Sequence, residues 1–155
     1  MRYFYKNKPV PMRTKFPRGV VTNQTTGNIG LFYACYALTL RGWNVMPTAR
    51  NARGIDIVAY SQNADRTVLV QVKTLSRMRR VGLGSSADSS IGDFVVICVR
   101  DYPNEPKCFV MKPSEVRKLA KSYEKNGKTS CWLPVSSYDD AKYRGRWERI
   151  GSGVA

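Results

Sequence analysis

The sequence predicts an α/β protein in which a small mixed β-sheet is flanked by helices. Three observations lead to this fold class. A segment with helical spacing precedes Gly42, several short runs rich in Val and Ile alternate with polar turns, and a second helical segment follows Pro113. Read along the chain, these segments give the element order α-β-β-β-β-β-α, with helices at both ends of a run of strands.

The first helix is predicted from about residue 25 to Arg41, because Gly42 suits the residue that ends a helix. Apolar and aromatic residues recur along it at helical spacing, and we expect them to face the core. These residues are Ile29, Tyr33, Tyr36, Ala37 and Leu40. Residues 43–46 then predict a short first strand.

Residues 54–74 form the stretch around which the chain is organised, and they predict a β-hairpin. Two runs rich in Val and Ile enclose a polar turn at residues 61–66. Alternate side chains of a strand share a face, so Gln71 and Lys73 point the same way. If the two strands pair so that their polar faces coincide, Asp56 lies with Gln71 and Lys73 at one end of the sheet. A buried charge is costly unless it is paired or bound, so these three residues are candidates for a functional site.

The second half of the chain predicts two more strands and a helix. Residues 93–99 form a strongly apolar run and indicate a central strand, and residues 107–111 indicate the next one. Pro113 suits the first turn of a helix at residues 114–125, which Asn126 and Gly127 would end. The Gly- and Ser-rich residues 81–90 predict a mobile loop. Residues 139–145 suggest a short helix, and the aromatic residues around it suggest a lid on the core.

Charge is the strongest global feature of the sequence. It has 26 Lys and Arg against 11 Asp and Glu, a formal net charge of +15 and a pI near 10.0. Self-repulsion of this size is relieved by a polyanion, so nucleic acid is the expected partner. No run of 18 apolar residues indicates a membrane span. The residues expected to contact nucleic acid are Arg50, Arg53, Arg77, Arg79 and Arg80.

The composition also bounds the domain organisation and the chemistry. Residues 1–22 read as a basic arm with aromatic residues and three prolines, and residues 23–155 read as one domain. There is no histidine, which excludes Ser-His-Asp catalysis and Cys2His2 zinc fingers built from this chain alone. The four cysteines form no Cys-x-x-Cys pair, and the N-terminus lacks the apolar core of a signal peptide. We therefore expect the cytoplasm or another reducing compartment inside the cell, not secretion.

An Asp on one strand followed by Gln-x-Lys on the next resembles the signature of the PD-(D/E)xK nuclease superfamily. The similarity covers roughly residues 25–112 and includes a helix opened by Gly27-Asn28-Ile29-Gly30 and a Gly-Trp-x-Val segment at Gly42. It implies a restriction-endonuclease-like fold, of the kind found in small Holliday-junction resolvases. Two positions depart from the pattern, since Gln71 stands where an acid is usual and Leu31 follows Gly30 where an early Glu is often found.

The resemblance also implies a site that uses Mg2+, with Mn2+ as the alternative. Asp56, the amide oxygen of Gln71 and the backbone carbonyl of Val72 would hold the ion, because hard cations take oxygen ligands. Lys73 would orient the attacking water or stabilise negative charge. If Asp56 and Lys73 simply form a salt bridge, the same residues would be structural.

Three functional hypotheses follow from the residues and the resemblance. The first is a metal-dependent DNA endonuclease of junction-resolvase, homing or restriction type, and two symmetric cuts in branched DNA would require a homodimer. The second is a DNA-binding protein with a nuclease fold that has lost catalysis through the two departures. The third is an RNA-binding accessory protein.

Overall fold

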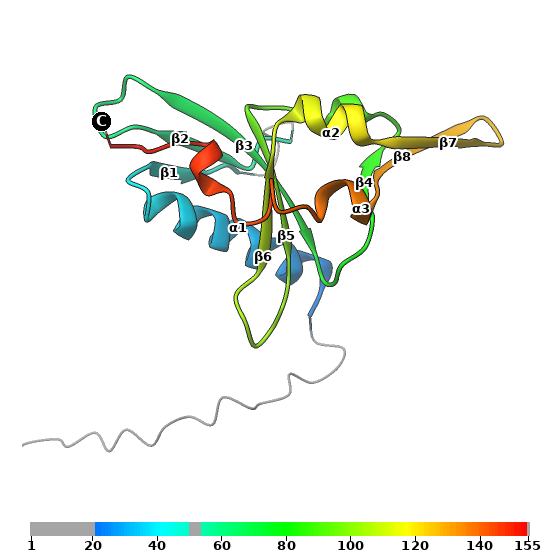
Figure 1. Ribbon diagram of the computed structural model, residues 1–155, viewed down its shortest axis with the longest axis horizontal. Helices are drawn as coiled ribbons and strands as arrows, with labels where there is room; N and C mark the ends of the chain where they lie inside the picture. Colours follow the sequence, from blue (N-terminus) through cyan, green and yellow to red (C-terminus); the bar gives the residue numbers. More distant parts are fainter. Residues whose placement is uncertain (1–20, 50–53, 155) are drawn as a thin grey trace, which may run out of the picture.

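The computed structural model describes residues 21–49 and 54–154 of the chain, and its centre is a five-stranded mixed sheet with the strand order β1-β2-β3-β5-β6 (Figure 1). The strands are β1 (Asn44–Pro47), β2 (Ile57–Tyr60), β3 (Thr67–Leu75), β5 (Phe94–Val99) and β6 (Lys107–Met111). Only the β3–β5 pair is parallel; the other neighbours are antiparallel. The predicted fold class and the order of these five strands are confirmed.

Helix α1 (Asn23–Thr39) covers one face of the sheet (Figure 1). Its buried residues are mostly small: Thr26, Gly30, Ala34, Ala37 and Leu38. A Cβ atom on Gly30 would collide with the side chain of Thr74 in β3, so glycine sets how closely helix and sheet approach. The sequence prediction was wrong for two residues of the expected core stripe, because Tyr36 and Leu40 are 55% and 65% exposed. The contact is made mostly by small residues, together with Leu38.

The opposite face of the sheet is covered by the second half of the chain. Buried residues there include Val95, Ile97 and Phe109 of the sheet, Val116 of α2 (Pro113–Leu119) and Leu133. The aromatic residues near the C-terminus close both cores. Tyr138 of α3 (Val135–Tyr138) and Tyr143 lie in this core, while Trp147 of η2 (Trp147–Arg149) lies in the core under α1. The predicted aromatic lid is confirmed for these three residues.

A second, three-stranded sheet was not predicted. It has the order β4-β8-β7 and consists of β4 (Val81–Gly84), β7 (Lys121–Lys125) and β8 (Lys128–Leu133). The helix predicted over residues 114–125 ends at Leu119, and residues 121–125 are a strand. Asn126 and Gly127 have φ values of 53° and 70°, as in the tight turn of a β-hairpin, so they connect two strands and do not end a helix.

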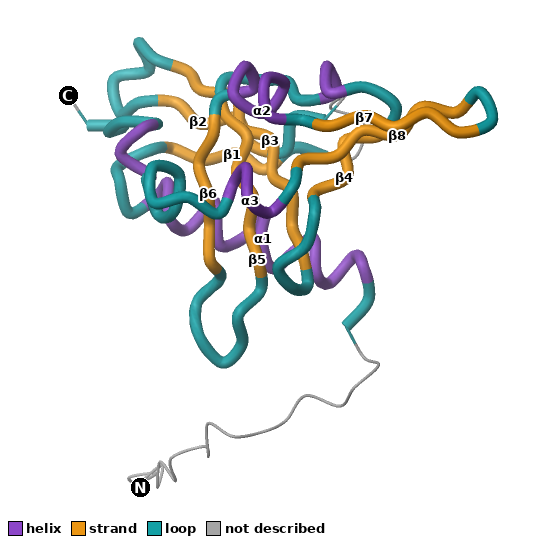
Figure 2. The backbone as a smooth tube through the Cα atoms, turned by 45° about the vertical axis from the view of Figure 1, so that its right-hand side comes forward, coloured by secondary structure: helices purple, strands orange, loops and turns teal. Residues whose placement is uncertain are grey.

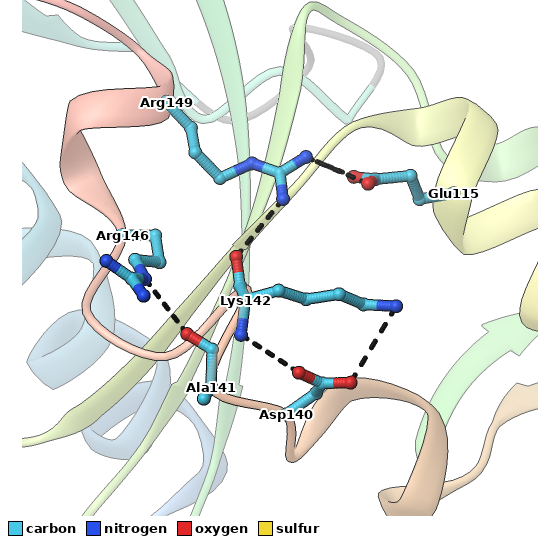
Figure 3. Close-up of polar contacts among 6 residues, drawn as sticks. All are labelled: Glu115, Asp140, Ala141, Lys142, Arg146 and Arg149. Carbon is cyan, nitrogen blue, oxygen red and sulfur yellow. Dashed lines mark hydrogen bonds and ion pairs between the residues drawn. The ribbon is translucent and has the colours of Figure 1, made fainter.

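Two further predictions about irregular segments were wrong. Residues 81–90 are not one open loop, since they contain β4 and a short 3-10 helix, η1 (Ala87–Ser89). The helix expected at residues 139–145 is a series of turns. Side-chain contacts hold these turns against α2, because the Arg149 guanidinium donates to both carboxylate oxygens of Glu115 at 2.8 and 2.7 Å and to the Lys142 carbonyl oxygen at 3.2 Å (Figure 3).

This ion pair affects the protonation of Glu115. Burial alone would raise the pKa of the carboxyl group, but hydrogen bonds from Arg149 and from the Lys112 N–H outweigh it and lower the pKa below its usual value. Glu115 and Arg149 thus connect α2 to the C-terminal turns. Among the described residues, no helix is long and apolar enough to cross a membrane.

Candidate active site

The candidate residues Gln71 and Lys73 share one face of β3, and hydrogen bonds hold Asp56 beside the same stretch of that strand. Ile57 pairs with Val70, and Asp56 lies one residue before β2, outside the paired residues of the two strands but hydrogen-bonded to the same stretch of β3. Ile57 and Val70 are buried under α1. Because neighbouring side chains in a strand alternate, Gln71 and Lys73 belong to the other face of β3.

Asp56 is fixed in place by contacts along its backbone and side chain. Its N–H donates to the Val70 carbonyl at 3.0 Å, and its own carbonyl accepts from the Thr48 N–H at 2.9 Å. Its carboxylate oxygen Oδ2 accepts from the Val72 N–H at 2.7 Å. The carboxylate is therefore held against β3 at the position between Gln71 and Lys73, and it is only partly buried.

Gln71 is the most informative residue of the site. Its side chain is 3% exposed, and its amide nitrogen Nε2 donates to the Ser89 carbonyl oxygen at 3.2 Å. A carbonyl oxygen only accepts hydrogen bonds, so this contact fixes which end of the amide is nitrogen. The oxygen Oε1 points elsewhere and has no hydrogen-bond partner among the described residues. Such an unpaired buried acceptor costs about 1–3 kcal/mol, unless something outside the described residues binds it.

The surroundings of Gln71 match an amide better than an acid. Gly54, with a φ of +89°, leaves room for the amide, since a Cβ there would lie 3.0 Å from Nε2. An ionised carboxylate at position 71 would place a second oxygen against the Ser89 carbonyl. Ser90 Oγ, in the residue after Ser89, is a second buried atom that finds no hydrogen-bond partner within residues 21–49 and 54–154.

Lys73 lies two residues further along β3, opposite Ile97 of β5, and is partly buried. Its neighbour Ile97 belongs to the core on the face of the sheet opposite α1. Thr74, on the other face, instead donates from its hydroxyl to the Gly27 carbonyl of α1 at 3.3 Å. The alternation predicted from the sequence is therefore present in β3.

The donor set suits a hard cation but holds little negative charge. Asp56 contributes a carboxylate, Gln71 contributes a buried, oriented amide oxygen, and the Val72 carbonyl belongs to the same strand. Among the described residues, no three His, Cys, Asp or Glu side chains gather closely enough to form a metal-binding group. These oxygens fit Mg2+ or Mn2+ in chemical type, with further ligands needed from substrate phosphates or water.

The arginines predicted to bind nucleic acid are only partly described. Arg50 and Arg53 lie outside the described residues, as does most of the predicted arm at residues 1–22. Arg77, Arg79 and Arg80 are exposed in the connection from β3 to β4. The guanidinium of Arg80 lies 4.8 Å from the ring centroid of Trp132 in β8, so this arginine is placed on the second sheet.

Sequence reasoning missed the contribution of η1 to the site. Ser89 orients Gln71 through its backbone carbonyl, and its hydroxyl donates to the Leu83 carbonyl of β4 at 2.5 Å. A backbone contact of this kind leaves no signal in the residue types. The β7–β8 hairpin did leave one, because Asn-Gly between two strand-like runs is a strong hairpin signal.

Comparison with known proteins is consistent with this fold. No family model and no curated protein matches the sequence. A solved structure described as a bacterial homing endonuclease, I-Ssp6803I, superimposes with a TM-score of 0.53 at 16% sequence identity. The match covers 83% of this chain and 93% of that one. At this level of identity the similarity concerns the fold alone: this chain has a nuclease-like fold similar to that of I-Ssp6803I.

Proposed function

We propose that this protein is a metal-dependent DNA endonuclease whose active centre is formed by Asp56, Gln71 and Lys73. The observation that carries the proposal is the buried, unpaired Oε1 of Gln71. The Ser89 contact orients it, and the neighbouring residue Val72 donates its N–H to the Asp56 carboxylate at 2.7 Å. The nuclease-like fold and the net charge of +15 support the same function.

In this proposal the residues have distinct roles. Asp56, Gln71 Oε1 and the Val72 carbonyl would hold Mg2+ or Mn2+, which supplies an activated water and stabilises charge on the phosphoryl oxygens. The Val72 N–H keeps the Asp56 carboxylate in position. Lys73 orients the water or stabilises the negative charge that develops on the phosphate. With one carboxylate in the set, metal affinity without DNA is expected to be weak.

Cleavage of supercoiled and branched DNA in Mg2+ and in Mn2+ tests the proposal. Lys73→Ala and Asp56→Ala should abolish cleavage while DNA affinity in EDTA stays close to wild type. Lys107→Ala serves as the matched control, because Lys107 is an exposed lysine of β6, separated from β3 by β5, and pairs with Asp101 at 3.0 Å. Cleavage that survives Lys73→Ala would refute the assignment of the active centre.

The second candidate is a DNA-binding protein with a nuclease fold and no catalysis. The observation that favours it is the single carboxylate in the donor set. It predicts tight, salt-sensitive DNA binding with no cleavage of any DNA in either metal. A branched substrate included in the same assay also tests for resolvase activity, for which a homodimer would be needed.

A further inference from the structure

The β7–β8 hairpin projects away from the body of the protein, as Figures 1 and 2 both show. Every residue from 121 to 130 is exposed. A two-stranded ribbon that buries so little surface gains little stability from the core. Its shape is therefore better explained by contact with a partner than by packing.

The strand register divides the hairpin into two chemically different faces. Residues directly opposite each other share a face, and Ser122 lies opposite Cys131, which is 8% exposed and points inward. The alternate pairs therefore lie on the outer face, where the Arg80 side chain covers Trp132. We call this the basic face; its residues are Arg80, Lys121, Tyr123, Lys125, Lys128, Ser130 and Trp132.

The charge on the basic face is unbalanced. It carries four cations and no acid, because Glu124, the acid of the hairpin, pairs with Thr129 on the other face. Lys125 lies directly opposite Lys128, and like charges in that position destabilise a hairpin. Within the described part of the chain, none of the hairpin lysines forms an ion pair. A polyanion bound to this face would remove the repulsion.

The dimensions of the hairpin match a DNA groove. The major groove of B-DNA is about 12 Å wide and admits a two-stranded β-ribbon. A strand of this length extends about 17 Å, which is about five base pairs at about 3.4 Å each. Between the lysines, the basic face presents Tyr123, 59% exposed, and Ser130, whose hydroxyl groups can donate to and accept from base edges.

We propose that the β7–β8 hairpin enters the major groove of duplex DNA, with its lysines on the phosphates and Tyr123 and Ser130 at the base edges. The inference rests on the proposed function, since it names the surface that positions the DNA to be cut. A hydrogen-bonded path connects the two places: Ser89 contacts both Gln71 and the Leu83 carbonyl of β4, and β4 pairs with β8. The hairpin would thereby fix which phosphodiester reaches Asp56.

The test compares two double variants with the same change in charge. Lys125→Ala/Lys128→Ala removes two cations from the basic face. Lys107→Ala/Lys142→Ala removes two exposed cations that pair with Asp101 and Asp140 elsewhere. Fluorescence anisotropy with a labelled duplex in EDTA measures binding without cleavage, over a series of salt concentrations.

The hairpin variant should bind the duplex roughly tenfold to sixtyfold more weakly at about 0.1 M salt. The slope of log affinity against log salt should become shallower by about 1.8, or about 0.9 for each lost phosphate contact. The control variant should stay close to wild type. Equal weakening in both variants would overturn the proposal, because net charge alone would then explain the effect.

A second measurement locates the groove. DNA in which cytosine carries a glucosylated hydroxymethyl group on C5 has a blocked major groove but an intact backbone. Wild type should bind this DNA as weakly as the hairpin variant binds ordinary DNA, and equal affinity of wild type for both DNAs would overturn the proposal. A preference for single-stranded RNA over duplex DNA that depends on Lys125 and Lys128 would also overturn the proposal.

Failure of the hairpin proposal can be told apart from failure of the proposed function. Cleavage that requires Lys73, together with DNA binding that ignores the hairpin, overturns only the hairpin proposal. Hairpin-dependent binding without cleavage in either metal supports the hairpin proposal and leaves the non-catalytic DNA-binding protein.

Discussion

Replacing Gln71 by Glu tests whether Oε1 is a metal ligand. The amide is 3% exposed and donates to the Ser89 carbonyl. A protonated carboxyl group can make the same donation, but an ionised carboxylate cannot, and it would bury a negative charge beside a carbonyl oxygen. Burial and the lost donor should both raise the pKa of the introduced group well above its ordinary value of about 4.3.

The cost of Gln71→Glu follows from the size of this pKa rise. A rise of about 2 units, at about 1.36 kcal/mol per unit, lowers the free energy of unfolding by about 2.7 kcal/mol at pH 8 and by about 1 kcal/mol at pH 5. The raised pKa gives the sign: the penalty is absent below the unfolded pKa of about 4.3 and grows until pH exceeds the folded pKa. At about 2–4 °C per kcal/mol, Tm should fall by roughly 5–10 °C at pH 8.

Thermal unfolding at pH 5 and pH 8, in EDTA and in Mg2+, measures these effects. If Asp56 and position 71 share a metal ion, Mg2+ should bind the variant and restore about 2.7 kcal/mol at about 100 times its Kd. Wild type, with one carboxylate, should respond much less. The matched control is Gln71→Met, which loses the same hydrogen bond without adding charge and should show neither the pH dependence nor the Mg2+ response.

Two outcomes would refute the reasoning. A Gln71→Glu protein whose loss of stability relative to wild type is the same at pH 8 as at pH 5 would mean that the side chain is not held against Ser89. A destabilised variant that Mg2+ fails to rescue would mean that the unpaired oxygen does not face a metal site. The second outcome would also weaken the case for an active centre at Asp56.

Two further predictions concern residues of helices α1 and α2. Gly30→Ala should destabilise the protein by about 1–3 kcal/mol, because its Cβ would collide with Thr74. At Gly27 nothing lies within 4 Å of an added Cβ, so Gly27→Ala should instead stabilise the protein by about 0.5–1 kcal/mol. Urea unfolding measures both variants, and equal effects of Gly30→Ala and Gly27→Ala on stability would contradict the close contact at Gly30. Folding lowers the pKa of Glu115, so its ionised carboxylate stabilises the folded protein at pH values above the unfolded pKa. This stability is lost as pH falls through the folded pKa. Glu115→Gln should therefore cost about 1–2 kcal/mol at pH 7 and much less near pH 3 in thermal unfolding, and a pH-independent cost would contradict the role of Arg149.

The local sequence determined much of the central sheet. Short apolar runs between polar turns located its five strands, and residue alternation assigned Gln71 and Lys73 to one face of β3 and Val70 and Val72 to the other. These predictions worked because the period of a strand is a local property of the backbone. The antiparallel hairpin also brought Asp56 next to this stretch of β3, where its carboxylate accepts from the Val72 N–H.

Local pattern failed where contacts between distant segments decided the structure. Residues 121–125 follow helix α2 in the chain, but they pair with β8 because Asn126 and Gly127 turn the chain back. That pairing creates the basic face. Tyr36 and Leu40 fit a helical core stripe, yet the tight contact at Gly30 turns small residues toward the sheet.

The candidate site shows the same division. Its three side chains could be chosen from the sequence, because charged and amide groups interrupt apolar strands. The orientation of the Gln71 amide could not, since it depends on a backbone carbonyl at Ser89, 18 residues away in the chain. Residue types record which groups a segment offers, whereas the direction of a hydrogen bond between distant segments exists only once the tertiary structure brings donor and acceptor together.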